Sequence, residues 1–144
     1  MTKSMKKISV LIVALMMLLS LTVVHAASDV NIGIYKDGSE TKFSMSNDTI
    51  VPGSQNLVIN GDEATLTFNI QPMEFMGIPG ELVKLSVDFG DGNYIPASFS
   101  GDKVTLKFPA SKLKDGKNFY PAKVKSNVWL IPIPTSDVEF CITK

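Results

Sequence analysis

The chain has 144 residues, which is enough for one ordinary domain with its own hydrophobic core. It contains 14 lysines, no arginine, 14 acidic residues, one histidine and one cysteine. This composition excludes an intrachain disulfide, since a single cysteine has no partner in its own chain. It also argues against nucleic acid as a partner, because the chain lacks both an excess of positive charge and the planar arginine fork that grips phosphates.

The first 26 residues have the pattern of a secretory signal peptide. Three lysines precede an apolar run at 8–24, and the run ends in Val24-His25-Ala26, a small-residue site suited to signal peptidase. We expect cleavage after Ala26. The alternative is an uncleaved membrane anchor, because the apolar run is near the minimum spanning length. The expected mature domain, residues 27–144, keeps 11 lysines against 14 acidic residues and has a net charge of −3. It is predicted to be secreted or associated with the cell envelope, with no transmembrane segment.

Removal of the signal would also remove His25, the one histidine of the chain. Without histidine, the mature domain cannot form a Ser-His-Asp or Cys-His catalytic site, and it lacks the commonest protein ligand of metals. Its acidic residues form no distinctive catalytic motif, and Cys141 has no histidine to activate its thiol. We therefore expect a protein that is not an enzyme and has no catalytic or metal-binding residues.

The segment DFGDGNY at 88–94 allows two interpretations. Asp88, Asp91 and Asn93 suggest a calcium loop, but their spacing differs from that of an EF-hand and no bidentate glutamate follows. A hairpin turn built on Gly90-Asp91-Gly92 is the favoured interpretation.

Apolar residues at every second position predict strands through most of the mature domain. The clearest pattern is at 63–70, which follows the turn signal Asn60-Gly61-Asp62 and completes a hairpin with 55–60. A short helical turn is expected only at 43–49 or 111–117. The remaining predicted strands lie at 30–35, 82–89, 94–99, 103–108, 119–133 and 138–142, with 94–99 and 103–108 expected to form a second hairpin.

About eight strands, with turns every 8–12 residues, are typical of an antiparallel β-sandwich. The core is expected to include apolar residues from the alternating positions of four strands. These residues are Ile32, Leu66, Phe68, Leu106, Phe108, Phe140 and Ile142.

Two apolar segments are not explained by strand alternation. In 127–134 (NVWLIPIP) both faces of a strand end are apolar, so the face that is not in the core must be covered by protein, a partner or a ligand. We expect Val128 and Leu130 to point inward, and Trp129 and Ile131 to point toward a binding site. The methionine-rich segment 72–79 (PMEFMGIP) is expected to be a loop that either plugs the open end of the sandwich or forms a ligand surface.

The order of these motifs resembles a NEAT (near iron transporter) domain. Such domains open with a strand, here VNIGIYKDGSE, continue with a lip turn of Ser-Met type, here FSMSNDTI at 43–50, and then form a valine-rich hairpin, here NLVINGDEATLTFNI. The last two strands of the family resemble 119–133 and 136–143. The resemblance implies an eight-stranded immunoglobulin-like sandwich that captures haem, or a haem-carrying protein, for iron uptake outside a bacterial cell.

In the family, haem lies between the lip and the hairpin of the last two strands. The resemblance therefore implies a ligand site at Ser44 and Met45 on one side, and at Trp129 and Ile131 on the other. The family's Tyr-x-x-x-Tyr motif is missing, because the corresponding segment, 134–140, reads PTSDVEF. Any haem is therefore expected to bind without the family's tyrosine ligand. The alternative function is a structural or adhesive envelope module that binds protein or glycan and has no haem pocket.

Overall fold

The computed structural model describes residues 24–27, 30–129, 131 and 133–144. The basic start and most of the apolar run of the predicted signal, residues 1–23, lie outside the described residues, and so does Leu130. In the described part of the chain, no helix is long and apolar enough to cross a membrane.

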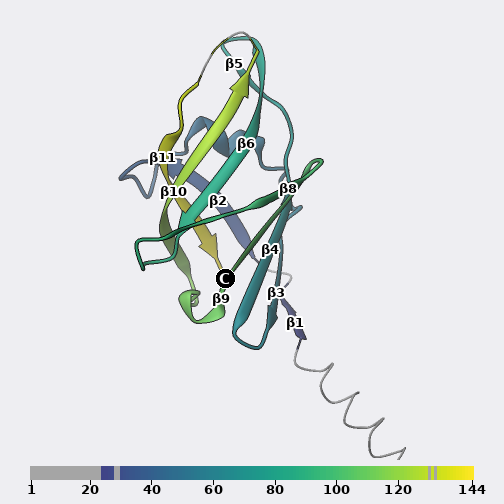
Figure 1. Ribbon diagram of the computed structural model, residues 1–144, viewed down its shortest axis with the longest axis vertical. Helices are drawn as coiled ribbons and strands as arrows, with labels where there is room; N and C mark the ends of the chain where they lie inside the picture. The colour runs from purple at the N-terminus through teal and green to yellow at the C-terminus, as the bar shows by residue number, and fades with distance from the viewer. Residues whose placement is uncertain (1–23, 28–29, 130, 132) are drawn as a thin grey trace, which may run out of the picture.

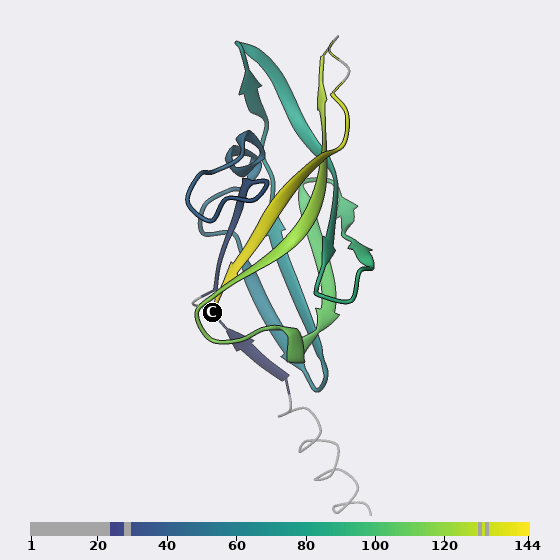
Figure 2. The same cartoon turned by 90° about the vertical axis from the view of Figure 1, so that its left-hand side faces the viewer.

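The described residues form two antiparallel sheets that pack face to face as an immunoglobulin-like sandwich (Figures 1 and 2). The first sheet has the order β1-β3-β4-β9-β8. Its strands are β1 (Val24–Ala27), β3 (Asn56–Asn60), β4 (Glu63–Asn69), β9 (Lys103–Pro109) and β8 (Ser98–Ser100).

The second sheet has the order β2-β11-β10-β6-β5, and β7 also pairs with β6. Its strands are β2 (Asn31–Lys36), β11 (Ser136–Thr143), β10 (Lys117–Val128), β6 (Ile78–Asp88), β5 (Met73–Phe75) and β7 (Tyr94–Pro96). The helical structure described is limited to two short 3-10 turns, η1 (Met45–Thr49) and η2 (Ala110–Lys112). The first lies within the predicted 43–49, and the second overlaps only the start of the predicted 111–117.

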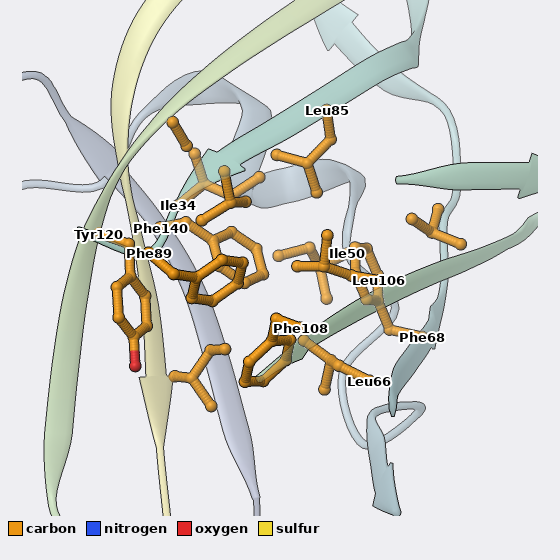
Figure 3. Packing of buried hydrophobic residues seen from close by; sticks show 14 of the residues in the cluster. Ile34, Ile50, Leu66, Phe68, Leu85, Phe89, Leu106, Phe108, Tyr120 and Phe140 are labelled. Atoms are coloured by element: carbon orange, nitrogen blue, oxygen red, sulfur yellow. The ribbon is translucent and has the colours of Figure 1, made fainter. Parts of the chain in front are cut away.

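The core lies between the sheets and is built from the alternating positions of the central strands. In β4, for example, Ala64, Leu66 and Phe68 are buried while the residues between them are not. Figure 3 shows the rings of Phe89, Phe108 and Tyr120 grouped in this core, and Phe89 stacks on Phe108 with ring centroids 4.3 Å apart. Six of the seven predicted core residues are buried, namely Leu66, Phe68, Leu106, Phe108, Phe140 and Ile142. The seventh, Ile32, is half-buried and packs against the core from its border.

Two local predictions are corrected by the strand pairing. The segment 94–99 does not form a simple hairpin with 103–108: β7 pairs with β6 in the second sheet, and β8 pairs with β9 in the first. The chain changes sheets at Ala97, whose N–H donates to Leu85 O at 2.8 Å. The apolar segment 72–79 is a β5–β6 hairpin rather than a loop.

A β-bulge in β6 adapts the second sheet to its core. Lys125 of β10 faces Lys84, but the next residue, Ser126, faces Leu82, so Val83 has no partner on β10. The extra residue lets Leu82 and Leu85 both point inward, although strict alternation would put them on opposite faces. The bulge lies beside the pocket described below.

Candidate ligand pocket

The lip of the pocket is η1, which is held on β2 by several hydrogen bonds. Ser44 caps the turn, since its Oγ accepts from Ser46 N at 3.3 Å and its carbonyl accepts from Asn47 N at 3.0 Å. Asn47 Oδ1 accepts from Ile34 N at 2.9 Å, and Ser44 N donates to Ile34 O at 2.9 Å. These bonds fix the lip against the sheet and leave the Met45 side chain half exposed at its edge.

The opposite wall of the pocket comes from the end of the β10–β11 hairpin. Val124 and Ser126 point inward from β10, and Ile133 and Pro134 come from the segment that leads into β11. Together with the lip they enclose a pocket of about 220 Å³. The complete lining is Lys36, Ser44, Met45, Ser46, Met73, Val124, Ser126, Ile133, Pro134 and Ser136.

The pocket combines an apolar interior with a polar rim. Met73 and Val124 are buried and uncharged, whereas Lys36 is exposed and is the only charged residue among those that line the pocket. Four serines also line the pocket: Ser46 and Ser126 are buried, whereas Ser44 and Ser136 are more exposed. Such a site suits an apolar molecule that carries an acidic group, because the lysine can approach that group without being buried.

The lining offers few candidate ligands for a metal. It contains no tyrosine, histidine or cysteine, so the only side chains with a soft donor atom are Met45 and Met73. In the part of the chain that the structure describes, no group of three His, Cys, Asp or Glu residues is arranged to hold a metal ion.

The structure brings together only half of the predicted site. Ser44 and Met45 line the pocket as expected. Trp129 is 72% exposed and follows directly after β10. It lies on the side of the outward residue Asn127, whereas the pocket residues Val124 and Ser126 are on the inward face of the strand. There it lines a separate hollow of about 260 Å³ with two prolines, Glu81 and Asn127. Ile131 is half-buried, donates its N–H to Val128 O at 3.0 Å, and is not among the residues that line the pocket.

Sequence reasoning missed the β10 wall of the pocket. The signal was present, since Tyr120, Ala122, Val124 and Ser126 share one face of a strand in which two of the three intervening residues are lysines. The segment 72–79 is predicted as a plug or a ligand surface, and Met73 is its residue that lines the pocket. In the structure Met73 is buried at the pocket, and Met76 is 88% exposed at the tip of the β5–β6 hairpin.

Tyr120 and Cys141 are both buried outside the pocket. The hydroxyl of Tyr120 donates to Lys112 O at 2.6 Å, and burial, with a smaller contribution from Cys141, raises the tyrosine pKa to about 12. Burial also raises the pKa of the Cys141 thiol. Cys141 lies on the outer face of the second sheet, opposite Gly33 of β2. The rings of Tyr35 and Phe43 lie close over Gly33: a Cβ at this position would be 3.0 Å from Tyr35 and 3.3 Å from Phe43.

The DFGDGNY segment is a turn whose carboxylates bind its own backbone. Asp88 Oδ1 accepts from Gly90 N at 2.8 Å and Gly92 N at 3.1 Å, and Asp91 Oδ1 accepts from Asn93 N at 3.0 Å. These bonds are what a polar turn between β6 and β7 requires, as in the favoured interpretation of the sequence.

No protein-family model matches this chain, and a search of curated proteins also gives no match.

Proposed function

We propose that the protein is an exported, non-enzymatic binding module, similar to a NEAT domain, that captures haem or a haem-carrying protein for iron uptake. The observation that supports this function is the pocket between the η1 lip and the β10–β11 hairpin. In a NEAT domain haem lies between the same two elements, and here the pocket contains Ser44 and Met45 of the lip.

The chemistry of the lining suits a porphyrin held mainly by apolar contacts. Met45, Met73 and Val124 supply apolar surface, and Lys36 at the rim would attract a propionate group. At about 220 Å³ the pocket is smaller than most small-molecule sites, which measure about 300–1,000 Å³. It would therefore take one edge of the ring and leave the rest accessible to a partner protein. Because the lining has no tyrosine, no tyrosinate would ligate the iron.

A haemin titration followed by visible absorbance tests this function. We expect saturable binding without tyrosinate bands, and a loss of affinity of about fivefold or more in Met45→Ala. Met76→Ala is the matched control, because this methionine is exposed and lies outside the pocket. Absence of saturable binding to both haemin and haem proteins would refute the proposal, and so would a tyrosinate spectrum abolished by Tyr120→Phe.

Lys36 provides a second test, based on the charge of the ligand. Lys36→Gln should weaken binding of haemin but not of its dimethyl ester, since the ester has no propionate charge to attract. Lys84→Gln is the control for net charge, because Lys84 lies on β6 outside the pocket. Equal losses for haemin and its ester would show that Lys36 does not contact a propionate.

The second candidate function is an adhesive or structural envelope module that binds protein or glycan. It is favoured by Trp129, an exposed aromatic side chain beside a hollow that also contains Glu81 and Asn127. Tryptophan is typical of interaction hot spots, because its large flat ring gives a wide contact area while the side chain loses little conformational entropy on binding. If this function holds, Trp129→Ala abolishes retention on isolated cell envelopes, whereas Met45→Ala leaves it unchanged.

A further inference from the structure

We propose that the mature protein forms a homodimer in which the β3 strands of two copies pair antiparallel and join their first sheets into one. The proposal rests on the predicted removal of residues 1–26 and is independent of haem binding. It begins with β1, which in the structure pairs with β3 from Val24↔Asn60 to Ala27↔Leu57. Figure 1 shows β1 at the outer edge of the first sheet, beside β3.

Cleavage after Ala26 removes all of β1 except Ala27. Among the residues whose burial the structure describes, the core cluster lies between Val30 and Ile142, so cleavage removes none of its members. The mature domain therefore keeps its sandwich, and β3 becomes the edge strand of the first sheet. An edge strand presents unpaired N–H and C=O groups that can pair with another chain.

The register of the β3–β4 hairpin shows which backbone groups become free. Asn60 and Glu63 flank the two-residue turn Gly61-Asp62, and such a turn is closed by a hydrogen-bonded pair. Because hydrogen-bonded and non-hydrogen-bonded pairs alternate along antiparallel strands, alternate residues of β3 point their backbone groups toward β4. The N–H and C=O groups of Leu57 and Ile59 consequently point to the opposite side, where β1 is found.

This edge carries none of the usual protection against pairing. Soluble proteins guard their edge strands with lysine, proline, bulges or inward-pointing charges. The sequence of β3 is Asn-Leu-Val-Ile-Asn, which has no charge and no proline, and its pairing with β4 is regular from Asn56 to Asn60. Asp62 and Glu63 lie beyond the stretch that would pair.

A second copy fits this edge because the strand is complementary to itself. Antiparallel pairing centred on Val58 places Asn56 opposite Asn60, Leu57 opposite Ile59, and Val58 opposite Val58 of the second copy. The Leu57–Ile59 pairs are then the hydrogen-bonded ones, which matches the backbone groups that face the open edge. The contact is isologous and closes on a two-fold axis, as in most homodimers. Since only five residues pair, we expect a weak, concentration-dependent dimer.

Sedimentation velocity of the processed chain, over about 1 μM to 1 mM, tests the proposal once intact mass has shown that the chain begins at Ala27. We expect a concentration-dependent dimer. A chain that begins at Val24 should remain monomeric, because its own strand occupies the edge. Val58→Lys should weaken dimerisation about tenfold or more, since two lysines would face each other at the axis. Thr65→Lys is the matched control, because Thr65 pairs with Val58 on β4 and lies one strand away from the axis.

Hydrogen exchange of the wild-type protein provides a test that needs no variant. The amides of Leu57 and Ile59 should be protected at high protein concentration and lose that protection on dilution, whereas the amide of Val58 should not change. The proposal would be overturned if the processed chain is a monomer at all concentrations, or if the chains that begin at Ala27 and at Val24 dimerise equally. It would also be overturned if Val58→Lys and Thr65→Lys have equal effects on dimerisation, or if the natural protein is processed upstream of Val24. Haemin binding is unaffected by any of these results.

Discussion

Replacing Phe68 with alanine tests whether the two sheets share one continuous core. Phe68 in β4 is 1% exposed, and its ring centroid lies 6.4 Å from that of Phe140 in β11, on the opposite sheet. Burial of an aromatic side chain removes about 150 Å² from water, which at about 25 cal/mol per Å² corresponds to about 4 kcal/mol. This value lies within the range of about 3–5 kcal/mol typical for Phe→Ala in cores.

Urea unfolding followed by far-ultraviolet circular dichroism measures the effect. With a slope of about 2 kcal/mol per molar urea, a loss of about 4 kcal/mol lowers the midpoint by about 2 M. Trp129→Ala is the control, because this side chain is 72% exposed and its removal should cost about 1 kcal/mol or less. A loss below about 1 kcal/mol for Phe68→Ala would refute its place in the core. A loss of about 3 kcal/mol or more for Trp129→Ala would refute the exposed position of the tryptophan.

Three further substitutions have defined expected effects. The pKa of Tyr120 is raised from 10.0 to about 12, so the phenol holds its proton more tightly in the folded state. Its contribution to the free energy of unfolding should therefore be fully present below pH 10 and be lost as pH rises toward 12. The slope is at most about 1.4 kcal/mol per pH unit, and denaturation of Tyr120→Phe at several pH values should show a smaller slope. Gly80→Ala should destabilise the protein by about 1–3 kcal/mol and so lower its melting temperature, since a Cβ at Gly80 would lie 2.8 Å from Val128 Cγ2. An unchanged melting temperature would contradict this. Met76→Asn should stabilise the protein by about 1 kcal/mol, because asparagine tolerates the left-handed conformation better than methionine, and Met76 has φ 51°; a lower melting temperature would show that no strain is relieved.

The strands that have one buried and one solvated face could be predicted from the sequence. In β4, β9 and β11 the predicted inward residues are buried, because a period of two is the direct consequence of the extended backbone. The prediction was weaker where both faces are covered. Cys141 lies on the outer face of β11 but is buried, and the aromatic residues Tyr35 and Phe43 lie over Gly33, its partner on β2. No local pattern indicates that a distant loop returns to cover a strand.

By itself, the sequence determined the class of the fold and most of its core, since these follow from local alternation. The lip residues Ser44 and Met45 followed only from the resemblance to a NEAT domain. Only the tertiary structure decided which surface completes the pocket. That choice depends on which face of β10 meets the lip. Pairing with β6 places Val124 and Ser126 there, and Trp129, directly after β10, lines a hollow on the opposite side with Asn127. Both faces of the 127–134 segment are apolar, so its own sequence could not distinguish them. The distinction comes from hydrogen bonds to β6, a strand far away in the chain.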